Sequence, residues 1–126
     1  MVCAGGGGVP VVRNCGGGLD SVEAVIDKDL TAAVLANQLA VDTMVIATDV
    51  EQAVIGWGSH SARPIGSTSA AKLRRLAADG HFGGGSMAPK VEAACRFAER
   101  GGRAIITSLH RITDGLAGRA GTIVTP

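Results

Sequence analysis

A run of glycines that leads directly into an amphipathic helix is the feature that most constrains the fold of this chain. Residues 83–85 are all glycine, and apolar side chains then recur at helical spacing over residues 91–98. Ser86 is predicted to cap this helix, and Pro89 is tolerated in its first turn, where its missing N–H group costs nothing. Lys90 falls in the same turn. Free backbone N–H groups, the positive end of the helix dipole and an ammonium group are therefore expected to converge.

This convergence has two interpretations. A helix N-terminus with a nearby lysine binds phosphate well. The alternative is an ordinary glycine loop followed by a surface helix whose lysine is solvated. The stretch by itself favours neither, so the other motifs of the chain have to separate them.

The composition narrows the class of protein. The 126 residues are 46% hydrophobic and 18% charged, which predicts one folded domain with a real core rather than a disordered chain. The net charge of +1 is scattered and aromatic residues are nearly absent, so we expect no nucleic-acid surface. No apolar run approaches the length that spans a membrane, and no signal peptide precedes the first motif. We therefore expect a cytoplasmic protein with no membrane partner.

The cysteines and histidines do not form a recognisable metal site. Cys3, Cys15 and Cys95 are odd in number and widely spaced, which favours reduced thiols in the core. The three histidines share no ligand spacing with one another or with the cysteines, and the predicted set of metal ligands is empty. His81, beside the glycine run, has two interpretations, a contact to a ligand or a loop histidine in water, and the second is favoured.

Strands alternate with helices along the chain. The clearest strands are Thr43–Thr48, expected to be buried on both sides, Arg103–Ser108 and Thr122–Thr125. Besides the helix after the glycine run, a largely buried helix is predicted over residues 30–40, with Asp27 as its cap. A further helix is predicted from a cap at Thr68 or Ser69 to Gly80, and a short one over residues 109–116. Weaker expectations are a strand over residues 1–4, a hairpin from residues 11–14 and 21–26, an edge hairpin at 53–57 and a loop over 59–67. The fold class is α/β: a mainly parallel sheet flanked by helices in three layers.

Two further features are candidates for chemistry. Lys28 lies between Asp27 and Asp29 at a junction before a helix, which fits either a neutralised surface turn or carboxylates that position ammonium groups for an anionic ligand. Asp49 follows the Thr43–Thr48 strand directly. In open α/β sheets, ligands bind at the carboxyl ends of the strands.

Taken together, the motifs resemble carbamate kinases, and they match in order and spacing along the whole chain. GxMxPKVEA is similar to the wider amino acid kinase superfamily, and Asp-Lys-Asp in place of its usual Asn-Ala-Asp points to carbamate kinases. The segments that carry the resemblance are AGGGGVPVV (4–12), VEAVIDKDLTAAVLA (22–36), ATDV (47–50), GSMAPKVEAA (85–94), AIITSL (104–109) and AGTIVTP (120–126).

The resemblance implies a phosphotransferase that makes carbamoyl phosphate and ADP from carbamate and ATP, reversibly, with Mg²⁺ held through the nucleotide phosphates. Lys28 and Lys90 would hold these phosphates and stabilise the transferring group, while Asp29 would orient the lysines. The remaining nucleotide contacts implied are Asp27, Thr48, Asp49, Val50, Gly85, Ser86 and Met87. The loop on the acceptor side would be Gly5, Gly6, Gly7 and Gly8.

The resemblance covers only the C-terminal, nucleotide-binding half of such a kinase. The N-terminal half, which holds the acceptor, is expected to be absent, so residues 1–126 are predicted to be a single domain from a truncated or split chain or from a misplaced start. Its partner would be a complementary N-terminal half or further copies of itself. Ala88 stands where these kinases usually have glycine, residues 83–84 replace Pro-Ala, and Ile55 and Trp57 lie in a segment that commonly contains tyrosine.

Two other functions stay open on the sequence. One is a kinase for another small carboxylate or phosphate acceptor, because the acceptor would be held mostly by the half that is missing. The other is a remnant without catalysis that binds nucleotide or another subunit.

Overall fold

The computed structural model describes residues 1–83 and 85–126, and its centre is a four-stranded sheet with the strand order β3-β7-β8-β6. These strands are β3 (Thr43–Thr48), β7 (Arg103–Ser108), β8 (Thr122–Thr125) and β6 (Ser67–Ser69). β3 pairs with β7 in parallel, from Thr43 opposite Arg103 to Thr48 opposite Ser108. β6 pairs with β8 in parallel, whereas β7 and β8 are antiparallel. The predicted mainly parallel α/β sheet is confirmed, with one antiparallel pair inside it.

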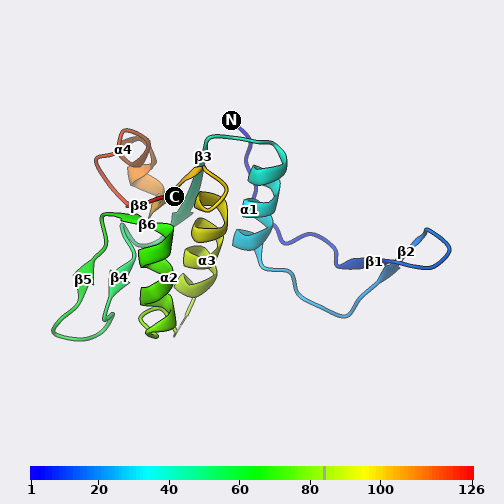
Figure 1. The fold of residues 1–126 in the computed structure, drawn as a ribbon, viewed down its shortest axis with the longest axis horizontal. Helices are drawn as coiled ribbons and strands as arrows, with labels where there is room; N and C mark the ends of the chain where they lie inside the picture. Colours follow the sequence, from blue (N-terminus) through cyan, green and yellow to red (C-terminus); the bar gives the residue numbers. More distant parts are fainter. Residues whose placement is uncertain (84) are drawn as a thin grey trace.

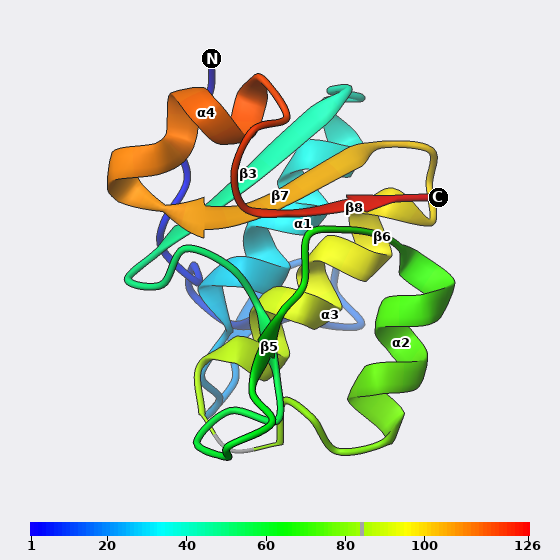
Figure 2. The ribbon, with the colours of Figure 1, turned by 90° about the vertical axis from the view of Figure 1, so that its left-hand side faces the viewer.

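Helices cover both faces of this sheet (Figure 2). One face carries α1 (Lys28–Gln38), α2 (Ala70–Ala78) and α3 (Met87–Ala98), and the other carries α4 (Ile112–Leu116), which follows the short 3₁₀ helix η1 (Leu109–Arg111). α3 lies between α1 and α2 and packs on β7. Its apolar residues, from Val91 to Ala98, are among the most deeply buried of the described chain. The three predicted layers are therefore present.

Two of the predicted helix caps are confirmed and one is wrong. The Asp27 carboxylate accepts hydrogen bonds from the backbone N–H groups of Asp29 and Leu30, and the Ser69 hydroxyl accepts one from Lys72. Ser86 occupies the N-cap position of α3, but its hydroxyl makes no capping bond. Its backbone is already helical (φ −75°, ψ −5°), which turns the side chain away from the free N–H groups. Gly84, within the glycine run before this helix, lies outside the described residues.

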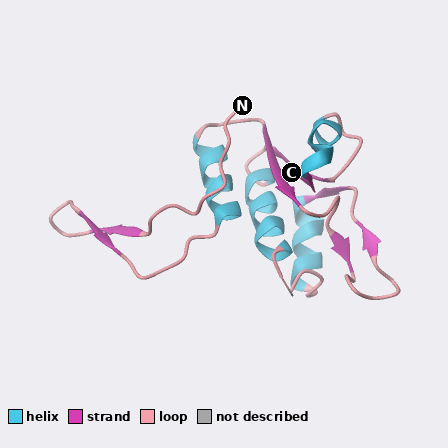
Figure 3. Cartoon of the chain, turned by 180° about the vertical axis from the view of Figure 1, so that it is seen from behind, coloured by secondary structure: helices cyan, strands magenta, loops and turns pink. Residues whose placement is uncertain are grey.

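Two hairpins leave the main body of the chain. β1 (Val11–Arg13) and β2 (Leu19–Ser21) form an exposed antiparallel ribbon that extends away from the helices (Figures 1 and 3). β4 (Val54–Ile55) pairs with β5 (Arg63–Pro64) in antiparallel orientation. The expected loop over residues 59–67 therefore contains the short strand β5 and the first residue of β6. Pro64 is tolerated in β5 because it lies at an edge where no N–H donor is required.

The exposure of several residues in the structure corrects other expectations drawn from the sequence. Residues 1–4 are exposed and form no strand. β3 is an edge strand, so its residues are not buried on both sides, and α1 is only half buried, with Val34 exposed. Of the cysteines, only Cys95 is a core thiol; Cys3 and Cys15 are exposed. Apolar character therefore predicts burial only where a second element covers the residue.

Among the described helices, none has the length and apolar character needed to cross a lipid bilayer.

Candidate functional site

A cluster of two lysines around one buried carboxylate lies where α1 and α3 begin. Asp29 accepts a hydrogen bond from Lys28 Nζ at 2.8 Å on one oxygen and from Lys90 Nζ at 3.0 Å on the other. Lys90 also donates to the Ser86 backbone carbonyl at 3.2 Å. The Lys28 side chain is 50% exposed, whereas that of Lys90 is 6% exposed. One ammonium thus faces solvent and the other is fixed in the interior.

The charge of this carboxylate is favoured by its partners. Burial alone would raise the pKa of Asp29, but the hydrogen bonds from Lys28 and Lys90, with their positive charges, outweigh it and hold the pKa below the ordinary aspartate value. Asp29 therefore stays ionised near neutral pH. An ionised Asp29 fixes the position of both ammonium groups.

The glycine-rich segment before β1 approaches the start of α1 at one residue. The Thr31 hydroxyl donates to the Asp27 carbonyl at 2.8 Å and contacts the Gly7 carbonyl at 3.3 Å. A Cβ atom at Gly7 would lie 1.9 Å from the Ile26 carbonyl oxygen, so only glycine fits this approach. The other residues of the predicted acceptor loop, Gly5, Gly6 and Gly8, are exposed and contact nothing in this way.

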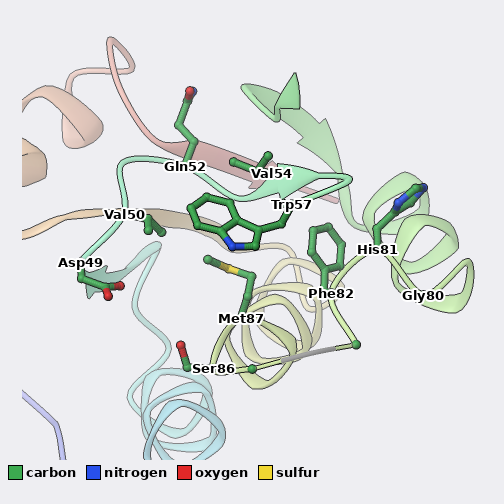
Figure 4. Close-up of a pocket in the computed structure, with 12 residues that line it drawn as sticks. Asp49, Val50, Gln52, Val54, Trp57, Gly80, His81, Phe82, Ser86 and Met87 are labelled. Atoms are coloured by element: carbon green, nitrogen blue, oxygen red, sulfur yellow. The ribbon is translucent and has the colours of Figure 1, made fainter. Parts of the chain in front are cut away.

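A pocket of about 440 Å³ opens beyond the carboxyl end of β3 (Figure 4). Figure 4 shows the indole of Trp57 above the thioether of Met87, with Asp49 and Ser86 to one side and Phe82 to the other. Its described lining residues are Asp49, Val50, Gln52, Val54, Trp57, Gly80, His81, Phe82, Gly83, Gly85, Ser86 and Met87. A flat apolar ring with polar edges is the kind of group that such a mixture of walls accommodates.

Ser86 joins the pocket to the lysine cluster. Ser86 lines the pocket, and its carbonyl holds the Lys90 ammonium. Asp27 adjoins the cluster, because its carboxylate accepts a hydrogen bond from the Asp29 N–H. Five of the predicted nucleotide contacts line the pocket: Asp49, Val50, Gly85, Ser86 and Met87. Thr48 does not line it, but the Thr48 hydroxyl donates to the Asp49 carboxylate at 3.0 Å.

Sequence reasoning missed part of the pocket. His81 lines the pocket, which fits the less favoured of its two interpretations, and the sequence does not point to Gln52, Val54 or Phe82. These residues come from the turn after α2 and from β4 and the segment before it, whose positions depend on long-range packing. In the described part of the chain, no three His, Cys, Asp or Glu side chains come together as a candidate metal site.

Comparison with known families defines the class of protein. Residues 2–108 match the model of the amino acid kinase family. The chain therefore belongs to the amino acid kinase family.

Within that family, the chain has carbamate kinases among its relatives. The chain is 46% identical to the carbamate kinase of Thermococcus kodakarensis over 125 residues, which is 98% of this chain and 39% of the relative. It is 44% identical to that of Haemophilus influenzae, over 99% of this chain and 39% of the relative. The chain is thus a homologue of carbamate kinases that spans about two fifths of their length.

Solved structures agree with this assignment. The carbamate kinase from Giardia lamblia bound to AMP-PNP superposes with a TM-score of 0.90 at 40% identity, covering 94% of this chain and 42% of the other. A protein from Aeropyrum pernix gives a TM-score of 0.87 at 47% identity, covering 94% and 38%. The expected partial amino acid kinase fold is confirmed.

Proposed function

We propose that the chain is the nucleotide-binding half of a carbamate kinase-like phosphotransferase, which converts carbamate and ATP into carbamoyl phosphate and ADP and also runs in reverse. The observation that carries the proposal is the Lys28–Asp29–Lys90 cluster, joined through Ser86 to a pocket lined by Trp57 and Met87. The relatives are named carbamate kinases, and one was solved with an ATP analogue.

In this proposal the pocket takes the adenosine group of ATP or ADP. Val50 and Met87 contact its apolar faces, Asp49 and Ser86 offer oxygens to its polar edges, and Gly85 leaves room for the backbone to approach. Thr48 would act through its bond to Asp49.

The two lysines neutralise the phosphates. Lys90 is held in one position by Asp29 and the Ser86 carbonyl, so its charge is already in place when negative charge develops on the transferring phosphoryl group. Lys28 is half exposed and offers its ammonium to the phosphates from the solvent side of the cluster. Asp29 positions both lysines and does not contact substrate. Mg²⁺, bound through the nucleotide phosphates, would supply further charge neutralisation.

Phosphoryl transfer also requires an acceptor held in line with the donor, and such alignment supplies about 7–11 kcal/mol of the barrier. Gly7 and its neighbours offer only one side of an acceptor site. We therefore expect the lone chain to bind nucleotide weakly and to turn over negligibly, and a complementary N-terminal half to restore activity.

The test has two stages. Calorimetric titration of the folded chain with millimolar Mg-ADP should give heat of binding, and its absence would contradict the nucleotide site. The N-terminal half of the Thermococcus kodakarensis carbamate kinase is then added, and ATP formed from ADP and carbamoyl phosphate is measured.

In the reconstituted enzyme, Lys90→Ala should lower kcat more than it weakens ADP binding, because Lys90 acts mainly on the transition state. Lys72→Ala, at an exposed lysine of α2, is the matched control and should change neither. ADP binding without any ATP formation would support a remnant without catalysis. Turnover by the lone chain that Lys90→Ala abolishes would show that no second half is required.

A further inference from the structure

A buried threonine on β8 takes part in the ladder of the hairpin that carries Trp57. Thr122 is fully buried and lies far from residues 53–65 in the sequence. The Thr122 hydroxyl accepts a hydrogen bond from the Ala53 N–H at 2.9 Å and donates one to the Ile65 carbonyl at 2.5 Å. One hydroxyl thus contacts both strands at the base of this hairpin.

The register of the hairpin explains why this hydroxyl matters. Val54 pairs with Pro64 and Ile55 with Arg63, so Ala53 and Ile65 form the next antiparallel pair. Two bonds are expected between the backbones of such a pair. Only one is direct, from the Ile65 N–H to the Ala53 carbonyl at 2.8 Å. The second is replaced by the Thr122 hydroxyl, which stands between the Ala53 N–H and the Ile65 carbonyl.

A second contact fixes the same end of the hairpin. The Gln52 side-chain amide donates to the Gly121 carbonyl at 3.1 Å, directly before Thr122. Gln52 lines the pocket, as do Val54 and Trp57 further along the hairpin. Trp57 itself is 71% exposed, so its place over the pocket depends on how the hairpin is held at its base.

We propose that Thr122 is a positioning residue for the pocket: its hydroxyl, set into the ladder between Ala53 and Ile65, fixes the hairpin that places Trp57 against a bound aromatic base. Thr122 does not contact the ligand. Loss of the hydroxyl leaves the Ala53 N–H and the Ile65 carbonyl without partners in a buried place, and the hairpin base opens to recover water. The identity of the ligand as a nucleotide rests on the proposed function, but the positioning of the hairpin does not.

The experiment compares Thr122→Val, which removes the hydroxyl at constant volume, with Thr122→Ser, which keeps it. Thr107→Val is the matched control, because Thr107 is a buried threonine of β7 whose hydroxyl has no hydrogen-bond partner among the described residues. Trp57 is the only tryptophan of the chain, so fluorescence reports on the hairpin alone.

Two measurements need no ligand. In Thr122→Val, deuterium exchange at the Ala53 amide should accelerate about tenfold, the factor expected from losing one buried hydrogen bond. The time-resolved anisotropy of Trp57 should show greater local motion, while exchange in α3 stays unchanged. Thr122→Ser and Thr107→Val should behave as wild type.

A third measurement follows the binding of Mg-ADP by Trp57 fluorescence. Thr122→Val should weaken binding severalfold, and the two other variants should not. Wild-type exchange and anisotropy in Thr122→Val would overturn the inference, as would a mobile Trp57 in Thr122→Ser. If Thr122→Val does not fold, Thr122→Ser alone decides in the same way. Failure of wild type to bind ADP would count against the proposed function, and the two ligand-free measurements would still decide the role of Thr122.

Discussion

Lys90 and Asp29 lie 61 positions apart in the sequence, and the Lys90 ammonium meets the Asp29 carboxylate at 3.0 Å in the interior between α3 and α1. Both residues are about 95% buried. Each charge is tolerated there only because the other is present. This pair therefore ties the start of α1 to the first turn of α3, and it also keeps a cation beside the pocket.

Asp29→Asn should destabilise the fold. The substitution leaves the Lys90 ammonium buried without a counter-charge, and breaking a buried pair from one side costs about 3–5 kcal/mol of unfolding free energy. Urea denaturation followed by circular dichroism measures the loss. Lys28→Met is the control; since Lys28 is half exposed, we expect a change within about 1 kcal/mol. Equal losses in the two variants would contradict the unequal roles of the lysines.

The free energy of unfolding should also fall at acid pH, because the Asp29 carboxylate becomes protonated there. The two lysines hold the pKa of Asp29 below its ordinary value of 3.8, although burial opposes them. Because the pKa of Asp29 is lower in the folded than in the unfolded chain, its contribution to the free energy of unfolding is complete above about pH 4. That contribution is lost as the pH falls through the pKa of Asp29 in the folded state.

Urea midpoints at pH 7, 4 and 3 test this expectation. Glu92 and Glu99 also have lowered pKa values, mainly because Arg74 bonds to both, so wild type loses stability from several groups at once. The contribution of Asp29 is the part of the decline that is missing in Asp29→Asn. If the urea midpoints of wild type and Asp29→Asn fell equally with pH, the contribution of Asp29 would be contradicted.

Of the three thiols, two should react quickly with a thiol reagent and one should be protected from it. Burial raises the pKa of Cys95 to about 11, so this residue is a neutral, inaccessible thiol at pH 8, whereas Cys3 and Cys15 are exposed. Ellman's reagent should label Cys3 and Cys15 quickly and Cys95 only at the rate of unfolding. Cys95→Ala should remove the slow phase and nothing else. A third fast thiol in wild type would refute the placement of Cys95.

The chain by itself should associate in solution. β3 is an edge strand, and exposed apolar residues lie on the outer side of α1 and along the β1–β2 ribbon, among them Val34, Val11, Val12 and Leu19. Uncovered edges and apolar patches favour contacts between copies.

Light scattering should therefore give a mass above the 12.6 kDa of one chain. Val34→Glu, which puts a charge on the exposed side of α1, should shift the mass towards the monomer, and Lys72→Glu on α2 should not. A monodisperse wild-type monomer that unfolds cooperatively would exclude the prediction.

Much of the fold could be predicted from local patterns. Asp27 and Ser69 are helix caps that act within three residues of their own position, and the Thr43–Thr48 and Arg103–Ser108 runs form strands because β-branched side chains favour extended backbone. The residues of the lysine cluster also stand beside their helix starts, but their roles are implied by the resemblance of the motifs to carbamate kinases and not by the local pattern.

Which residues meet was decided by tertiary packing. The contact of Lys90 with Asp29, the insertion of Thr122 between Ala53 and Ile65, and the places of Trp57 and His81 in the pocket all join distant parts of the chain. The same holds for burial: β3 lies at an edge because of the strand order, although its sequence is that of a central strand. Local sequence fixes the backbone conformation of each element through sterics and capping bonds. The neighbours of an element follow only from how all the apolar faces are covered together.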